Sequence, residues 1–309
     1  MRISDALPVA RFELTVRQLE PLQLPVYAGS MLRGAFGHAL KAVACLRPGA
    51  ACGSCPLRAT CPYIEVFETP APAGNPHAQS ANPYVVEAPP PGERRLAGGE
   101  EWVFHLVLAG RALRFAGLVF RAWRRALGGG LGERRARARL LSVDLCHGVL
   151  RQRVLGASEE RLAPFEAPVP EPVPGAARRI DFLTPLRLQE QGRILPPGEV
   201  DARRLLMTLA RRVQNLLDCH AVAPLRLPLP ALATAAAALT LRHGLSPLRW
   251  SRFSSRQQQE MALPGLVGPV ELEGDASAFD ELLAVGELLH VGKNATFGLG
   301  HYAFGGAPG

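Results

Sequence analysis

Four cysteines stand close together in the chain with the spacing C-x6-C-x2-C-x5-C: Cys45, Cys52, Cys55 and Cys61. Thiolates bind zinc tetrahedrally, and the two-residue gap between Cys52 and Cys55 is typical of a zinc knuckle. Clustered cysteines in a cytoplasmic protein favour a metal over disulfides. We therefore expect one structural zinc ion, which four thiolates would close off from catalysis. An iron–sulfur cluster and a metal-free loop are the alternatives.

A glycine-rich segment near the C-terminus, residues 286–300, has the sequence GELLHVGKNATFGLG. Glycines allow backbone N–H groups to approach a phosphate closely, and a lysine in the loop adds a positive charge. The spacing differs from that of a P-loop, because GxxxxGK[ST] is absent. We expect phosphate contacts here, with a tight helix-to-strand turn as the alternative. The expected contacts are made by Gly292, Lys293, Asn294, Gly298 and Gly300.

The formal net charge is +8, and all of the 35 basic side chains except Lys41 and Lys293 are arginines. A basic surface favours polyanions such as nucleic acid. The arginine bias also fits a GC-rich genome. Arginine nevertheless offers a planar fork for phosphates and a face for stacking on bases.

Two groups of arginines are candidates for gripping a nucleic acid. Arg135, Arg137 and Arg139 alternate at the start of a predicted strand, so they would share one face. Trp250 and Phe253 stand among a second group, and this basic and aromatic mixture suits the stacking of an unpaired base. The second group consists of Arg249, Arg252 and Arg256. A solvated charged face is the alternative for the first group.

Both halves of the chain show the order β-α-β-β-α-β, which is ferredoxin-like. This order predicts an α+β fold with two tandem ferredoxin-like, RRM-like domains and antiparallel sheets. In the first half we expect strands over 9–19, 101–108 and 138–144, helices over 29–43 and 111–126, and irregular structure over 69–99. In the second half we expect strands over 180–188, 248–256, 269–272 and 297–304, and helices over 201–219 and 277–289.

A length of 309 residues suits two domains that each bury a core. We expect an N-terminal domain over 1–162 with the cysteine-rich loop inserted, a proline-rich linker over 163–176, and a C-terminal domain over 177–309 with the glycine-rich loop. The chain has no apolar run of membrane-spanning length and no signal-peptide pattern. We therefore expect a cytoplasmic protein without a membrane partner.

Six segments follow one another in a characteristic order: LRGAFGHAL at 32–40, FLTPL at 182–186, WSRFSSRQ at 250–257, LPGLVG at 263–268, LHVGK at 289–293 and FGLG at 297–300. Together they resemble the CRISPR-associated precursor-crRNA processing endoribonucleases, the sixth Cas family of the RAMP superfamily. The resemblance implies two RAMP-type domains and metal-independent cleavage of CRISPR repeat RNA that leaves a 5′-hydroxyl and a cyclic phosphate. The long loop over 69–99 and the cysteine cluster depart from many members of the family.

Metal-independent cleavage uses the 2′-hydroxyl of the RNA as nucleophile, so the site needs a base, an acid and positive charge. The resemblance puts the general base in or just after the first helix, where His38 is the one histidine. Lys41 lies three residues later on the same helix face and is the expected transition-state stabiliser. Tyr27, just before the helix, is a weaker helper. A helix histidine packed beside the sheet is the alternative for His38.

Two other functional classes are also compatible with the sequence. A non-catalytic RAMP subunit would bind crRNA as a scaffold in an effector complex, and it would lack a competent base. A zinc-stabilised RNA-binding module would account for the charge and the cysteines, but not for the ordered C-terminal motifs. The expected partners are CRISPR repeat RNA, crRNA and a multisubunit CRISPR effector complex.

Overall fold

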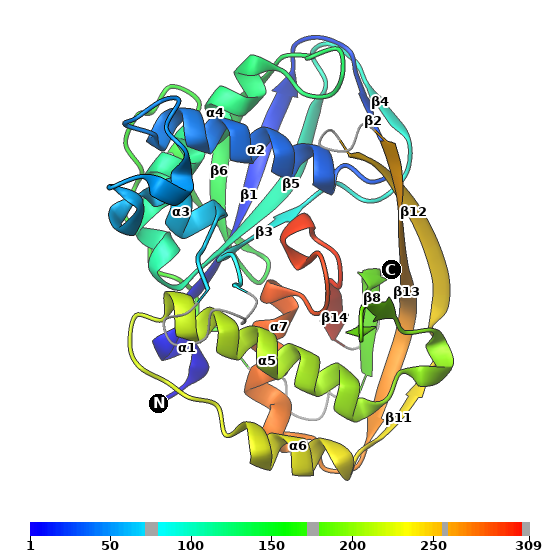
Figure 1. Ribbon diagram of the computed structural model, residues 1–309. Helices are drawn as coiled ribbons and strands as arrows, with labels where there is room; N and C mark the ends of the chain where they lie inside the picture. Colours follow the sequence, from blue (N-terminus) through cyan, green and yellow to red (C-terminus); the bar gives the residue numbers. More distant parts are fainter. Residues whose placement is uncertain (72–79, 172–178, 255–258, 305–309) are drawn as a thin grey trace. The chain divides into compact units, whose positions relative to one another are not determined.

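The computed structural model describes residues 1–71, 80–171, 179–254 and 259–304 (Figure 1). Contacts divide the chain into two compact units, one of residues 9–168 and one of residues 1–8 and 169–309. The first eight residues, which we expected in the N-terminal domain, group with the C-terminal unit because helix α1 (Ile3–Ala6) contacts helix α7 (Asp280–Leu289). Among the described residues, none of the helices combines the length and apolar character needed to cross a bilayer.

The N-terminal unit is built on a five-stranded antiparallel sheet with the order β3-β5-β1-β6-β7. Its strands are β1 (Val9–Gln18), β3 (Tyr84–Glu87), β5 (Glu101–Ala109), β6 (Ala138–His147) and β7 (Leu150–Gly156). The first four have the fourth-first-third-second arrangement of a ferredoxin-like sheet, and β7 extends one edge. Strand β3 lies within the stretch that we expected to be irregular, because its four residues are too short a signal among prolines and glycines.

Helices α2 (Gly29–Ala44) and α4 (Ala116–Gly129) lie on one face of this sheet (Figure 1). Alternate residues of β1, Phe12, Leu14 and Val16, are fully buried in the same core as the helices. The ring of Trp123 from α4 stacks on Phe36 from α2, with centroids 5.1 Å apart and planes 7° apart. Helix α4 begins later than expected, because residues 110–115 form a 3₁₀ turn.

Three short elements of the N-terminal unit follow from local sequence. Helix α3 (Pro62–Phe67) begins with proline, which is pre-shaped for a first helical turn. Strands β2 (Leu22–Leu24) and β4 (Arg94–Leu96) pair as a separate two-stranded sheet. Our sequence analysis predicted none of the three, since each is shorter than a reliable periodic pattern.

The C-terminal unit also has an antiparallel sheet, with the order β11-β13-β8-β14 and with β12 paired to β13. The strands are β8 (Arg179–Leu186), β11 (Thr240–His243), β12 (Ser246–Ser254), β13 (Gln259–Glu273) and β14 (Tyr302–Phe304). The fourth-first-third-second arrangement therefore recurs as β14-β8-β13-β11. This recurrence confirms the predicted α+β class with ferredoxin-like topology in both units.

Helices α5 and α6 and a small hairpin also belong to this unit. Helix α5 (Ala202–His220) is capped by Asp201, whose side chain accepts a hydrogen bond from the Arg204 amide at 2.6 Å. Helix α6 (Leu229–Ala237) was not expected from the sequence, because its alanine-rich pattern has little periodicity. Strands β9 (Gln189–Glu190) and β10 (Arg193–Ile194) form the hairpin that precedes α5.

Two segments of the C-terminal unit differ from the expected strands. Residues 263–268, which lie between the expected strands 248–256 and 269–272, are inside the long strand β13, which pairs with β12 and β8. Gly268, with φ of +119°, sits where the pairing with β8 shifts register, so the glycine accommodates a bulge. Conversely, residues 297–301 are not strand: a 3₁₀ turn and two glycines with positive φ precede the short β14.

Gly286 is the point at which α7 packs tightly within the C-terminal unit. A Cβ atom there would collide with the Tyr302 hydroxyl and lie 2.7 Å from Cδ2 of Leu209. We expect Gly286→Ala to lower the free energy of unfolding by about 1–3 kcal/mol through overpacking, although alanine favours helix. Urea titration followed by circular dichroism measures this loss. The control, Gly128→Ala in α4, adds a Cβ with no atom within 4 Å; an equal loss there would contradict the packing argument.

Candidate active site

His38 lies on an exposed strip of helix α2. Leu32, Phe36 and Leu40 bury the opposite side of the helix in the core. Gly34 and Ala42, one turn before and one turn after His38, share its face. A Cβ at Gly34 would meet no atom within 4 Å, so no bulky group shields the imidazole at that position. His38 and Ala42 are exposed and Gly34 is half-buried, so the three residues form a strip on which the imidazole of His38 is accessible.

Lys41 and Tyr27 are not gathered around His38 in the way that we expected. The Lys41 Nζ atom lies 5.5 Å from the Tyr63 ring centroid, and its side chain lines a cavity formed by the cysteine loop. Tyr27 is only 4% exposed. Burial, helped by the negative charge of Glu87, raises the pKa of the Tyr27 phenol far above its ordinary value. Tyr27 therefore stays protonated and faces the interior.

The glycine-rich loop uses two of its expected phosphate-binding amides internally. The Gly298 amide donates to the Ala295 carbonyl at 2.8 Å, and the Gly300 amide donates to the Pro185 carbonyl at 3.0 Å. Both glycines are buried, and a side chain at Gly300 would collide with the Val291 carbonyl oxygen. Their positive φ and close backbone packing account for the glycines. The expectation that these two amides face a phosphate is therefore wrong.

The other half of the loop is closer to solvent. Gly292, Lys293 and Asn294 are half-buried. The Lys293 amide donates to the Arg187 carbonyl at 2.9 Å, and the Asn294 side chain accepts from the Arg187 guanidinium. These bonds fix the backbone of the turn. Within the loop, Lys293 is thus the side chain best suited to a phosphate contact.

A half-buried arginine, which our sequence analysis missed, holds the loop in place. Arg212 on α5 donates from Nε to the carbonyls of Leu289 at 3.0 Å and His290 at 3.1 Å. These are the last carbonyls of α7, where a positive charge is favourable. Burial lowers the pKa of Arg212 to about 10, so it remains charged near neutral pH. His290 is itself buried and stacks on His301, with centroids 4.6 Å apart.

The expected arginine groups have separate outcomes. Arg135, Arg137 and Arg139 are exposed, but β6 begins only at Ala138, so the first two precede the strand. Arg137 is ion-paired with Glu20 at 2.7 Å. Arg249 and Arg252 lie on β12, opposite Pro264 and Met261 of β13. Arg256 lies outside the described residues.

The cysteines of the cluster lie at the ends of successive short elements. Cys45 follows α2, and Cys52 and Cys55 bracket a 3₁₀ turn. Cys61 directly precedes α3. All four line one small cavity.

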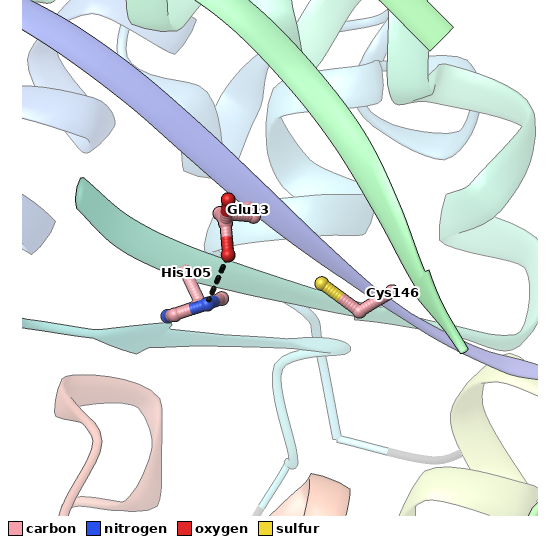
Figure 2. Close-up of side chains that lie close together, drawn as sticks. All are labelled: Glu13, His105 and Cys146. Carbon is pink, nitrogen blue, oxygen red and sulfur yellow. Dashed lines mark ion pairs between the residues drawn. The ribbon is translucent and has the colours of Figure 1, made fainter. Parts of the chain in front are cut away.

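A second polar group, which our sequence analysis also missed, occupies the sheet face of the N-terminal unit opposite α2 and α4. Figure 2 shows Glu13 of β1, His105 of β5 and Cys146 of β6 side by side, with an ion pair between Glu13 and His105. The His105 Nε2 atom lies 3.4 Å from the Glu13 carboxylate. Glu13 stands directly opposite His105 in the pairing of β1 with β5. The alternation in EWVFHLVL indicates that His105 points to the sheet face opposite that of the buried Trp102 and Phe104.

The electrostatics of this sheet face favour ion pairs over a bound cation. The donor atoms of Glu13, His105 and Cys146 lie within 4.8 Å of one another, a spacing that a metal ion could bridge. However, Arg151 donates to Glu13 at 3.2 Å, and Arg11 pairs with the neighbouring Glu87 at 2.7 Å. Burial raises the pKa of the Cys146 thiol, which disfavours the thiolate that a metal needs. The face is therefore a network of paired charges.

Comparisons with known proteins agree with this architecture. Residues 180–302 match the family model described as CRISPR-associated endoribonuclease Cas6, and residues 7–167 match a family model described as an N-terminal domain. No curated protein matches the chain. Among solved structures, a product complex of Cas6 from Thermus thermophilus is similar over 96% of this chain and 99% of that chain, with 18% identity and a TM-score of 0.56.

Two further solved structures share the fold. A RAMP protein that binds different RNA substrates is 11% identical over 96% of this chain and all of that chain, with a TM-score of 0.50. A Cas6-RT-Cas1–Cas2 complex contains a chain that is 12% identical; the match covers 97% of this chain and 46% of that chain, with a TM-score of 0.55. The chain shares with these structures the fold of two ferredoxin-like units. By its family match, residues 180–302 form a Cas6-type domain, that of the CRISPR RNA-processing endoribonucleases.

His105 should make the stability of the N-terminal unit depend on pH. Burial, followed by the charge of Arg11, lowers its pKa below the ordinary 6.5, although Glu87 and Glu13 oppose this effect. Below pH 6.5 the unfolded chain therefore binds more protons than the folded chain, so the free energy of unfolding falls as the pH falls. We expect His105→Gln to flatten this decline.

Urea titrations from about pH 5 to about pH 7 measure that slope. The matched control is His147→Gln, because His147 is an exposed histidine at the end of β6. An unchanged slope in His105→Gln would contradict the assignment. A change that is equal in both variants would contradict it as well.

Proposed function

We propose that this protein cuts CRISPR repeat RNA within precursor crRNA, without a catalytic metal. Attack of the 2′-oxygen on the adjacent phosphorus breaks the bond to the 5′-oxygen and leaves a cyclic phosphate and a 5′-hydroxyl. The observation that carries the proposal is the exposed imidazole of His38 on an unshielded helix face, in a chain with a Cas6-type domain. Because the substrate is a transcript, we place the reaction in the cytoplasm.

His38 acts as the general base in this proposal. An imidazole titrates near neutral pH and can accept the proton of the 2′-hydroxyl. In-line attack leaves the 5′-oxygen on the far side of the phosphorus, so a solvent molecule on the exposed strip supplies the proton to that oxygen. Lys41 is exposed and one turn away, so its long side chain can turn from Tyr63 to the phosphorane. Tyr27 keeps a supporting role through packing, because it is buried.

RNA is held through its phosphates and through unpaired bases. Lys293 supplies a point charge at the glycine-rich turn, and Gly292 and Asn294 shape that turn. Arg139 is exposed, and Arg249 and Arg252 extend along β12. Arginine and lysine contacts of this kind dominate affinity for nucleic acid and make it dependent on salt.

A second candidate function is that of a crRNA-binding subunit that does not cut. The placement of Lys41 and Tyr27 away from His38 favours it, because a base without its helpers is a poor catalyst. The solved Cas6-RT-Cas1–Cas2 complex shows that a similar chain assembles with other CRISPR proteins. We propose that this chain also delivers its RNA to a larger CRISPR complex in either case.

Replacing His38 separates these two functions. Labelled repeat RNA is incubated with the protein in EDTA, and both cleavage and binding are measured. We expect cleavage by the natural chain and a loss of about 10²–10⁴-fold in rate for His38→Ala, with the dissociation constant unchanged. His243→Ala, at an exposed histidine on β11, is the control. Binding without cleavage by the natural chain would establish the scaffold function instead.

Lys293 should contribute to binding and not to chemistry. We expect Lys293→Ala to weaken RNA binding and to reduce the slope of log affinity against log salt by about 0.7–0.9, the value for one phosphate contact. Fluorescence anisotropy at several salt concentrations measures both quantities. Arg193→Ala is the control, because Arg193 is exposed but ion-paired with Glu199 at 2.6 Å. If Lys293→Ala and the natural chain have the same slope of log affinity against log salt, Lys293 does not contact an RNA phosphate.

A further inference from the structure

The segment that joins α2 to α3, residues 45–61, is folded without a hydrophobic core. No residue in it is buried, and its two leucines, Leu46 and Leu57, are 82% and 40% exposed. The residues of the segment that are withdrawn at all from solvent are its four cysteines, each half-buried. Short segments that bury so little apolar surface usually need a disulfide or a metal to hold them.

All four cysteines meet at one cavity. Cys45, Cys52, Cys55 and Cys61 line a space of about 20 Å³, enough for a single ion or water molecule. The four are free thiols, so a disulfide does not hold the segment. No carboxylate lines the cavity. An all-sulfur set of donors selects zinc over calcium or magnesium.

The charges around the cavity suit a thiolate site. Lys41, Arg47 and Arg58 line it together with the cysteines. One zinc ion with four thiolates carries a net charge of minus two, which these three cations offset. Lys41, with its Nζ atom 5.5 Å from the Tyr63 ring centroid, is one of these cations.

We propose that Cys45, Cys52, Cys55 and Cys61 bind one zinc ion that fastens the end of α2 to the start of α3. Among the described residues, no three of these sulfurs lie within 4.8 Å of one another. A tetrahedral site with Zn–S bonds of about 2.3 Å brings them to about 3.8 Å apart. The segment consists of 3₁₀ turns with exposed side chains, so this closure displaces no packed core.

The zinc ion acts on α2 through α3. The Phe67 ring at the end of α3 lies against Gly37, where any side chain would collide with it, and forms an edge contact with Phe36 at 5.9 Å. Gly37 directly precedes His38. Fastening α3 to α2 therefore fixes the contact beside His38, and the zinc ion is a positioning device that takes no part in the chemistry.

Metal content tests the proposal without reference to RNA cleavage. We expect the purified chain to contain about one zinc per molecule by elemental analysis, as a closed four-thiolate site requires. Cys52→Ser and Cys55→Ser should each lose most of it. Cys219→Ser is the control, because Cys219 is a half-buried cysteine on α5 in the other unit. The Cys219→Ser protein should keep its zinc.

Cobalt substitution and proteolysis supply independent readings. Cobalt bound in place of zinc should show thiolate-to-metal charge-transfer absorption, which Cys52→Ser abolishes. Trypsin should cut after Arg58 slowly in the natural chain and about tenfold or more faster in Cys52→Ser, because the segment loses the metal that holds it. These outcomes hold even if the variant still folds around its intact core.

Several results would overturn the proposal. A natural chain that neither contains zinc nor takes up zinc or cobalt has no site. Iron with acid-labile sulfide would show a cluster in place of zinc. Equal loss of zinc in Cys219→Ser would show that another site holds it. Zinc content is measured before and after the EDTA step of the cleavage assay, so failure of the metal site and failure of the RNA chemistry are distinguished.

Discussion

Alternation along the central strand β1 is the constraint on which the N-terminal unit depends. Phe12, Leu14 and Val16 are buried on the face covered by α2 and α4, so the residues between them must point to the other face. Glu13 is one of them, and Arg11, just before Phe12, points the same way; neither can enter an apolar core unpaired. This second face therefore becomes a network in which His105, Glu87 and Arg151 supply the partners. A register slip of one residue would bury charge and expose the core.

The C-terminal unit depends in a similar way on satisfying backbone groups around α7. The helix ends at Leu289, and its last carbonyls meet the guanidinium of Arg212. The following loop turns back through positive-φ residues and bonds to the end of β8 through Gly300 and Lys293. The geometry of the turn thus explains most of its glycines. The RNA contact that we propose falls on the half-buried stretch from Gly292 to Asn294.

The connection between α2 and α3 is the part of the chain in which ordinary packing is absent. Elsewhere in the N-terminal unit a stacked aromatic core, with Trp123 and Phe36 at its centre, holds the helices. Between Cys45 and Cys61 only Cys52 and Cys61 pack against that core, and all four cysteines line one small cavity. In our proposal a metal there would hold the C-terminal end of α2, while the aromatic core holds the rest of the helix. The chemistry proposed for His38 and the metal proposed for the cysteines thus concern adjacent turns of one helix.

Local patterns in the sequence predicted the ferredoxin-like order of both units, the main helices and the resemblance to the Cas6 endoribonucleases, because these depend on periodicity and on motifs that follow one another in order. The sequence also located the cysteine cluster through spacing alone. Only the tertiary structure showed that the Gly298 and Gly300 amides are bonded internally, that Arg212 caps α7, and that Glu13 and His105 face each other. It likewise turned Lys41 toward Tyr63 and buried Tyr27. Periodicity and spacing describe residues that are close in sequence. Hydrogen-bond partners, burial and charge pairing depend on segments that are far apart in the chain and meet only in the folded protein.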